Sequence, residues 1–513
     1  MNSCRAAVPT PLPVSEDFGG VIVVGSHRQL LFDDFFMSRG CLNPSCYGDR
    51  PRFADWLHGI KWCVGRTEKS PHPLLEADRP WESGVYWNCV IRDGGKFRMW
   101  YFSHDPVIVP KASYVCYAES DDGASWRKPD VNLVKWNDSS RNNIVFTGLP
   151  ETRSMELGNV FIDPSAKPDE RYKMIYTAFE GGTLDPVGKT KFIGASGVLR
   201  GAYSPDGLHW TVYNEKFQPS YSDTQNSATY DPVLGKYVAY TRARSLYGGI
   251  HAGDDAVADV VRGRSVGRIE SSDYRHWTSS EIVVAPDFYD GLTVDLYNPS
   301  YSPYPAAQRS HFLFPSAMEQ YEGRVMVDVA VSRDNVHFMR PVRQAFIVPG
   351  EPTSFDSMGI YASPGIVSLD NAHCALYSRS DTTPHGGIHY DPDQVHPPKV
   401  GRAVFKRDRI IGIESSGQGA FSTRTLVFDG RRLVLNVEPI GPDAQVSVEI
   451  LPSDQEQPVQ GYAFQDCLPL SNDELDGEIR WKSGADLGQW AGKPVRLRVS
   501  MNAARLYAFQ FLT

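Results

Sequence analysis

The chain has 513 residues, of which 41% are hydrophobic and 22% are charged, and its formal net charge is −9. A length well above about 300 residues predicts two domains, because single hydrophobic cores seldom grow further. The mildly acidic balance argues against nucleic acid as a partner, and no apolar run approaches the roughly 18 residues that a membrane span needs.

The N-terminal segment gives expectations about location and thiol chemistry. The first twenty residues contain three prolines and lack the apolar core of a secretory signal. The chain as written is therefore expected to be soluble and cytoplasmic, or secreted or periplasmic if a signal peptide has been removed. Eight cysteines form no C-x-x-C pair, so reduced thiols are expected, with a Cys41–Cys46 disulfide as the alternative.

The stretch "LFDDFF", residues 31–36, places two acids in an apolar segment. It is interpreted as a strand, in which alternation sends one of Asp33 and Asp34 inward and the other outward. Asp34 is retained as a candidate catalytic residue. The alternative is that the inward acid forms a salt bridge with an arginine.

A turn of the form Ser-x-Asp-x-x-x-aromatic occurs four times, about 60 to 85 residues apart. Each copy follows an alternating strand that is itself preceded by two more, so each unit contains three strands, the turn and a fourth strand. One copy would carry little weight, because Ser, Asp and Gly are common in hairpins. Four copies in register make coincidence a poor explanation. The copies begin at Ser120, Ser204, Ser271 and Ser332.

Four-stranded antiparallel sheets repeated at this period are typical of a β-propeller. A fifth set of strands follows between residues 361 and 408 without the turn, which favours five blades. From residue 409 the alternating strands lose the repeat and read as a β-sandwich. The predicted fold is all-β: residues 1–408 form a five-bladed propeller with an N-terminal strand, and residues 409–513 form an accessory β-sandwich.

This domain order resembles the arabinanase, invertase and levansucrase superfamily of propeller glycoside hydrolases. The stretches "LFDDFF", "MWY", "ERYKMIY" and "GRRLVLNV" also resemble bacterial invertase-like glycosyl hydrolases. The invertase signatures W-M-N-D-P-N, R-D-P and E-C are absent, so substrate and mechanism do not carry over. The resemblance implies one carboxylate from each of three blades in the central channel, and an oligosaccharide or glycoside as the substrate.

Acidic residues recur near the starts of four successive inner strands when these are aligned on their closing turns. They are Glu82, Glu156, Asp223 and Asp295. Glycoside hydrolysis needs a general acid and a second carboxylate that acts as base or nucleophile. Asp223, Asp295 and Glu156 are the catalytic candidates, and the apolar neighbours of Glu156 suit a desolvated proton donor. Each acid could instead cap a turn, a role favoured for Glu82 in "PWESG".

Five residues are candidates for substrate binding. Trp87 and Tyr297 could stack on sugar rings, and Arg242 in "YTRAR" needs a carboxylate partner, which Asp223 or the substrate could supply. Glu82 and His385, the latter in the glycine-rich "TPHGG", complete the set. Packing or turn roles would explain each of them equally well. No cofactor is expected to be required, although a structural calcium ion could occupy the channel.

Three functions remain open. An exo-acting glycosidase that cleaves a terminal bond of a furanoside or related sugar is favoured, because the acids recur at one depth around a channel. A glycoside phosphorylase of related fold would need a basic cluster, for which Arg242, Arg244 and Arg268 are available. A non-catalytic carbohydrate-binding propeller would keep the aromatic residues and lose a paired carboxylate. The sequence leaves the sugar, the linkage and the oligomeric state open.

Overall fold

The computed structural model describes residues 20–38, 57–106, 113–150, 152–184, 192–217, 222–246, 249–250, 263–389, 391 and 394–513. The chain divides into two compact units. The propeller unit comprises Thr67–Pro303 and His311–Val404, and the sandwich unit comprises Met1–Arg66, Tyr304–Ser310 and Phe405–Thr513. Cys41 and Cys46, the alternative disulfide pair, lie outside the described residues. The five cysteines within them are buried and unbridged.

Three antiparallel sheets of the propeller unit match the predicted repeats. The first contains β6 (Asn88–Asp93), β7 (Lys96–His104), β8 (Ser113–Ser120) and β9 (Ile144–Phe146). The second contains β10 (Thr152–Ile162), β11 (Tyr172–Leu184), β12 (Phe192–Ser204) and β13 (Thr211–Val212). The third contains β14 (Ser227–Asp231), β15 (Lys236–Leu246), β17 (Gly263–Ser271) and β18 (Glu281–Val284), with β16 (Gly249–Ile250) beside β15.

The fourth and fifth strand sets are less regular than the repeat suggests. One three-stranded sheet contains β20 (Tyr301–Pro303), β21 (His311–Leu313) and β24 (Ala330–Ser332). An eight-stranded sheet contains β19 (Val294–Leu296), β22 (Ser316–Glu319), β23 (Arg324–Val327), β25 (Gly359–Ala362), β26 (Val367–Ser368), β27 (His373–Asp381), β28 (Lys399–Lys406) and β5 (Glu68–Lys69). The two sets merge because β23 pairs in parallel with β25. The N-terminal strand β5 forms the outer edge of the fifth set.

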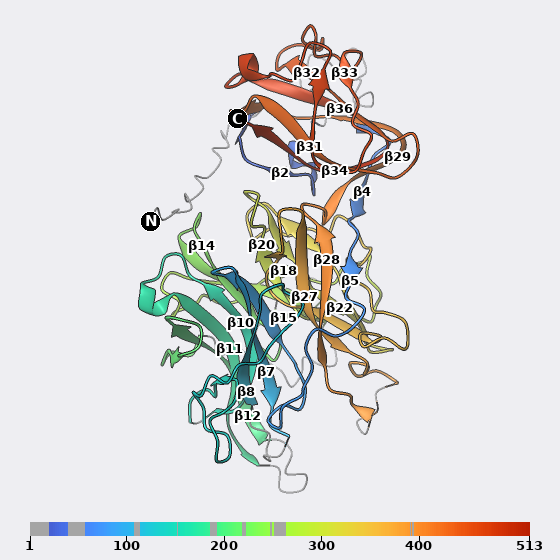
Figure 1. Cartoon of the computed structure of the whole chain (residues 1–513). Coiled ribbons are helices and arrows are strands. Elements are labelled where there is room, and N and C mark those ends of the chain that lie inside the picture. Colours follow the sequence, from blue (N-terminus) through green and yellow to red (C-terminus); the bar gives the residue numbers. More distant parts are fainter. Residues whose placement is uncertain are drawn as a thin grey trace. The chain divides into compact units, whose positions relative to one another are not determined.

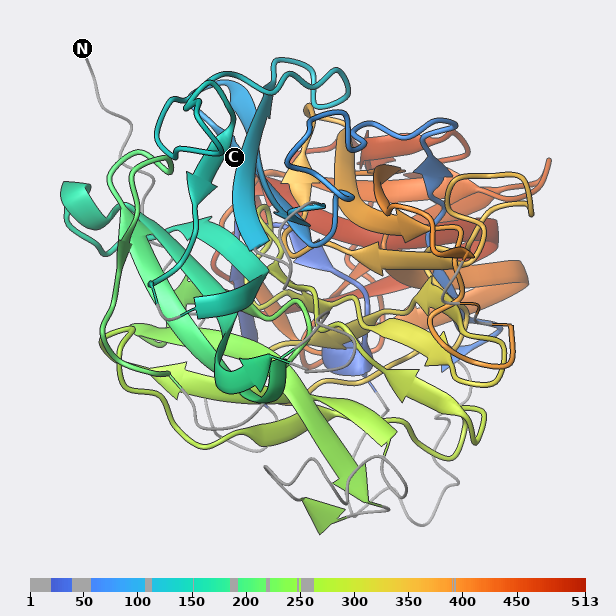
Figure 2. The same ribbon diagram turned by 90° about the horizontal axis from the view of Figure 1, so that it is seen from below.

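The sheets of this unit follow one another in chain order around a common centre (Figure 2). Side-chain amides connect their inner segments there. Gln225 donates hydrogen bonds to the carbonyl oxygens of Asn88 at 2.6 Å and Gly158 at 2.9 Å, and Asn298 donates to the carbonyl of Ala362 at 2.9 Å. These five residues come from five inner segments, so the centre of the propeller is a buried polar floor. The predicted all-β propeller is confirmed.

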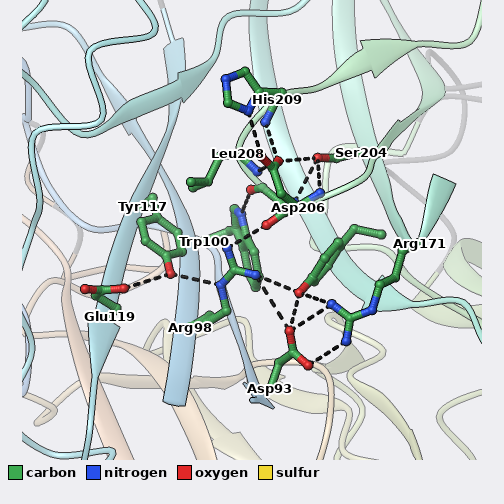
Figure 3. A network of polar contacts seen from close by, with 12 residues as sticks. Asp93, Arg98, Trp100, Tyr117, Glu119, Arg171, Ser204, Asp206, Leu208 and His209 are labelled. Atoms are coloured by element: carbon green, nitrogen blue, oxygen red, sulfur yellow. Dashed lines mark hydrogen bonds and ion pairs between the residues drawn. The ribbon is translucent and has the colours of Figure 1, made fainter. Parts of the chain in front are cut away.

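The repeated turn joins neighbouring sheets. In the second copy, the Gly207 amide donates to Ser204 Oγ at 2.8 Å, and Asp206 Oδ1 accepts the His209 amide at 2.9 Å. Trp100 of β7 then donates its indole N–H to the carbonyl oxygen of Gly207 at 2.7 Å. Figure 3 shows this turn beside Trp100. The motif therefore holds one blade against the blade before it.

The residue after the Asp has a positive φ in all four copies: Gly123 (70°), Gly207 (78°), Tyr274 (65°) and Asn335 (59°). Glycine and asparagine accept this region readily, but a bulky residue does so only when its surroundings compensate. Tyr274 is fully buried, and its ring lies 5.7 Å from Phe161 and 5.1 Å from Phe217, both in the second strand set. The carbonyl oxygens of Gly123, Gly207 and Asn335 each accept a hydrogen bond from a neighbouring blade. Tyr274 instead packs its ring on the neighbouring blade, and its carbonyl accepts the indole N–H of Trp277 in its own turn.

The sandwich unit is organised around the C-terminal strand β36 (Val495–Leu512) (Figure 1). Its ten-stranded sheet also contains β29 (Ile411–Ser422), β30 (Leu426–Phe428), β31 (Arg432–Pro439), β32 (Gln445–Pro452) and β34 (Glu474–Glu478). Alternate side chains of these strands face a core that includes Leu433, Val448 and Phe511. A short hairpin pairs β33 (Cys467–Leu468) with β35 (Arg480–Trp481). The second all-β domain is confirmed.

The N-terminal residues differ from the sequence-based expectation. Strands β1 (Ile22–Gly25), β2 (Gln29–Leu30), β3 (Leu57–His58) and β4 (Lys61–Val64) pair with strands of the sandwich sheet, whereas the prediction grouped them with the propeller. The predicted strand over "LFDDFF" is also wrong. Asp33 Oδ1 accepts the Phe35 amide at 3.2 Å and caps a 3₁₀ helix, η1 (Asp34–Phe36). Within the described residues, no helix has the length and apolarity to cross a bilayer.

Candidate active site

Three of the predicted acids lie in one region of the propeller unit, each on or beside an inner strand. Glu156 lies on β10, Asp223 lies four residues before β14, and Asp295 lies on β19. Two of them form ion pairs with arginines from the adjoining strands: Asp223 with Arg242, and Asp295 with Arg264 at 2.7 Å. The charges of Glu156, Arg242 and Arg264 all act on Tyr297, so the three acids and their arginines share one region of the unit.

Among the described residues, Glu156 differs from Asp223 and Asp295 in having no ion pair with an arginine or lysine. Its Oε2 atom is buried and has no hydrogen-bond partner among the described residues. Burial raises the pKa of Glu156 to about 7, although a side-chain hydrogen bond with Trp87 and the charges of Arg379 and Arg242 act in the opposite direction. A carboxyl group with a pKa near neutrality can give up and regain a proton under ordinary conditions.

Asp295 is held more rigidly than an isolated surface acid would be. Its side chain is only 2% exposed, and it accepts the backbone N–H of Arg264 at 2.8 Å in addition to the guanidinium. Asp223 is connected to the same region through its backbone, because the Tyr297 hydroxyl donates to its carbonyl oxygen at 3.4 Å. An arginine partner stabilises a carboxylate anion, which is the form that a base or nucleophile must have.

Aromatic rings surround these charged pairs. Trp87 precedes β6, and its ring lies 5.3 Å from Tyr361 of β25 and 6.4 Å from Tyr297. The Arg379 guanidinium lies 4.7 Å from the Trp87 ring centre, and that of Arg264 lies 5.2 Å from the Tyr297 ring centre. Both predicted stacking residues therefore belong to the group, although both are buried and contribute to packing.

A cavity of about 550 Å³ opens beside this group. Its lining includes Tyr86, Arg264, Arg379, Asp381, His385 and His396. The predicted residue His385 comes from the loop after β27, and its Nδ1 atom lies 2.8 Å from the Tyr361 hydroxyl. Burial and the nearby charges of Arg379, Arg264 and Arg242 lower the pKa of His385 to about 3, so the imidazole is neutral at physiological pH.

Two predicted residues are not part of the acid and arginine pairs described above. Glu82 Oε1 accepts a hydrogen bond from the Tyr101 hydroxyl at 2.6 Å, and its Oε2 pairs with Lys128 at 2.6 Å. Glu82 is thus a buried ion-pair partner beside the first strand set. Its Oε2 also accepts the Asp78 amide at 3.1 Å, which agrees with the turn-capping role that its loop sequence favoured. Asp34 lies in η1 of the sandwich unit and does not belong to the group of propeller residues.

Sequence reasoning missed Arg264, Arg379, Asp381 and Tyr361. Arg379 follows "YS" on β27 just as Arg242 follows "YT" on β15, so the signal that identified one arginine was present for the other. Arg264 is the second residue of β17, which is not an inner strand, so the alignment of inner-strand starts did not include it. Of the other two arginines considered for a basic cluster, Arg268 pairs with Glu270 at 2.8 Å, and the side chain of Arg244 lies outside the described residues.

The group does not fit a calcium site. Calcium binds six to eight oxygen ligands, usually with several carboxylates. Within the described ranges, no three His, Cys, Asp or Glu residues cluster as metal ligands would. Asp223 and Asp295 are instead committed to arginines.

Comparison with known proteins gives only distant likenesses. No protein-family model matches the sequence, and no curated protein matches it significantly. A solved structure described as a glycoside hydrolase is 13% identical with a TM-score of 0.46, covering 66% of this chain and 92% of its own. A glycosyl hydrolase from Bacteroides ovatus is 16% identical with a TM-score of 0.42, over 68% and 96% of the two chains.

A third solved structure belongs to work on the GH130 family of mannoside phosphorylases, which contains hydrolases that target β-1,2 mannosidic linkages in Candida mannan. It is 14% identical with a TM-score of 0.41, over 68% of this chain and 96% of its own. At these identities and TM-scores, the matches assign neither a substrate nor a reaction to this chain.

Proposed function

We propose that the chain is a glycoside hydrolase that acts on a terminal glycosidic bond, with Glu156 as the proton donor. The observation that supports this most directly is the carboxyl of Glu156, whose Oε2 atom is buried and whose pKa is raised to about 7 by burial, although Trp87, Arg379 and Arg242 act in the opposite direction. Protonation of the leaving oxygen needs an acid that still carries its proton near neutral pH. Glu156 meets that requirement.

The second carboxylate of the reaction is Asp223 or Asp295. Both are paired with arginine, which favours the anion that attacks the anomeric carbon or removes a proton from water. In the retaining course, this anion forms a glycosyl–enzyme bond and the Glu156 carboxylate then activates water. In the inverting course, it activates water directly. Identification of the anomer first released, by NMR during hydrolysis, distinguishes the two courses.

Phosphorolysis is the second candidate, because Arg242, Arg264 and Arg379 all act electrostatically on His385. A phosphorylase would use inorganic phosphate in place of water and would release a sugar phosphate. Each of these arginines already has an aspartate partner, which favours hydrolysis. Added phosphate should therefore leave the rate of substrate cleavage unchanged.

The test is a panel of aryl furanosides and pyranosides, with oligosaccharides, assayed with and without phosphate. Glu156→Gln keeps the side-chain shape and removes the proton donor, so turnover should fall by at least about 100-fold. If Asp223 is the second carboxylate, Asp223→Asn should likewise abolish turnover while the melting temperature stays close to wild type; if Asp295 is, Asp295→Asn should abolish it instead. Glu281→Gln, at an exposed glutamate of β18, is the matched control and should retain activity. Wild-type-like turnover by Glu156→Gln would refute the assignment.

A further inference from the structure

The cavity beside the proposed catalytic group presents more hydrogen-bond donors than its protein partners use. Arg379 gives Nε and Nη2 to Asp381, with the shorter contact at 2.8 Å, and its Nη1 has no acceptor among the described residues. Arg264 gives Nη1 to Asp295 at 2.7 Å, and its Nη2, which is not among the buried atoms, has no acceptor among the same residues. Both guanidiniums therefore keep N–H groups that a ligand could bind.

The ion pairs are oriented with their cations toward the cavity. The Arg264 side chain is 24% exposed and its partner Asp295 is 2% exposed, while the values for Arg379 and Asp381 are 17% and 8%. Both arginines line the cavity together with Asp381, whereas Asp295 does not. A ligand in the cavity thus meets two guanidinium groups and one carboxylate, and that carboxylate is already paired with Arg379.

His385 and Gly386 also line the cavity and bring no negative charge to it. Burial and arginine charges keep His385 neutral, and no carboxylate opposes that effect at its imidazole. The Gly386 backbone has a φ of 78°, and an added Cβ would meet no atom within 4 Å, so this part of the wall is open. The cavity volume of about 550 Å³ lies in the range of about 300–1,000 Å³ that is usual for small-molecule sites.

We propose that this cavity binds the carboxylate of an acidic sugar, a uronic acid residue of the substrate, through Arg264 and Arg379. Guanidinium groups bind carboxylates through paired N–H donors, and such charge-assisted bonds are stronger than bonds to neutral hydroxyls. Tyr86, which lines the cavity and whose ring centre lies 5.3 Å from the Arg379 guanidinium, would lie beside the sugar ring. The inference rests on the proposed function and names its substrate class.

Binding is measured by calorimetry on the full chain carrying Glu156→Gln, with glucuronate, galacturonate, the matching neutral sugars and inorganic phosphate as separate probes. At least one uronate should bind about tenfold or more tightly than its neutral counterpart, the factor expected for one charge-assisted hydrogen bond. Adding Arg264→Gln or Arg379→Gln should remove this preference, and Arg264→Lys should keep part of it. Arg127→Gln, at an exposed arginine paired with Glu119, is the control and should change nothing.

Cleavage assays on paired aryl uronides and aryl hexosides separate the two proposals. Hydrolysis of neutral glycosides without any preference for uronides would overturn the acidic-sugar inference and leave the hydrolase proposal standing. Uronate binding that depends on Arg264, with no glycoside cleaved, would refute the hydrolase and support the anion site. Binding of phosphate alone, or cleavage that requires phosphate, would show that the arginines serve free phosphate and would overturn the inference.

Discussion

Replacement of Glu156 by glutamine tests the electrostatic basis of the site without a substrate. The pKa of Glu156 is about 7 in the folded chain, raised by burial from an ordinary value of 4.5. Between these two values the folded state holds a proton that the unfolded state has released, so stability falls as the pH rises. At about 1.36 kcal/mol per pKa unit, the ionised unfolded state gains at most about 3 kcal/mol by pH 8. Glutamine does not titrate and avoids this loss.

The expected result is a pH-dependent gain in stability. Relative to wild type, the free energy of unfolding of Glu156→Gln should rise by up to about 3 kcal/mol between pH 4 and pH 8. Urea unfolding followed by tryptophan fluorescence at pH 4, 6 and 8 measures this difference, with Glu281→Gln as the control that should stay flat. A difference that is constant across this range, or a variant that loses stability at pH 8, would refute the raised pKa and its origin in burial.

The remaining predictions concern activity and the repeated turn. If Glu156 is the acid, kcat/KM should fall as the pH rises above about 7, and a profile flat to pH 9 would exclude it. Gly207→Ala should lower stability by at least about 1 kcal/mol, because its φ is 78° and a Cβ would lie 2.6 Å from Trp100. Gly94→Ala shares a positive φ but meets no atom within 4 Å, so the difference between their melting temperatures isolates the clash. Partial burial acts to raise the pKa of Asp206, but hydrogen bonds from His209 outweigh it and lower the pKa to about 2. The Asp206 anion therefore stabilises the folded state at pH 7, and this stabilisation is lost as the pH falls through 2. Asp206→Asn should lower the melting temperature at pH 7 and have little such effect below pH 2. An equal drop in melting temperature at pH 7 and below pH 2 would mean that the charge of Asp206 does not contribute to stability.

The sequence was informative about the propeller because its repeat has a local cause. The Ser and Asp side chains of the turn bond to amides two or three residues away, so the signal survives without knowledge of the fold. Departures from the repeat that arise from pairing between distant segments could not be predicted from the sequence. The parallel contact between Val325 and Gly359, which merges the fourth and fifth strand sets, depends on two segments far apart in the chain.

The same distinction explains the outcome for the site residues. Counting back from the turns located Glu156, Asp223 and Asp295 because inner strands start at similar distances from them. Glu82 met the same criterion, but its carboxylate is taken by Lys128, a residue 46 positions away. Partners of this kind are set by packing between elements, and no spacing rule in one sequence reveals them.

The arginines of the site raise an apparent conflict that the structure resolves. The charges of Arg379 and Arg242 favour the anion of Glu156 and act to lower its pKa, yet burial dominates. Each of these arginines pairs with an aspartate, Arg242 with Asp223 and Arg379 with Asp381. Because the desolvation of Glu156 outweighs the two charges, the acid keeps its proton near neutral pH, which is the state that a proton donor requires.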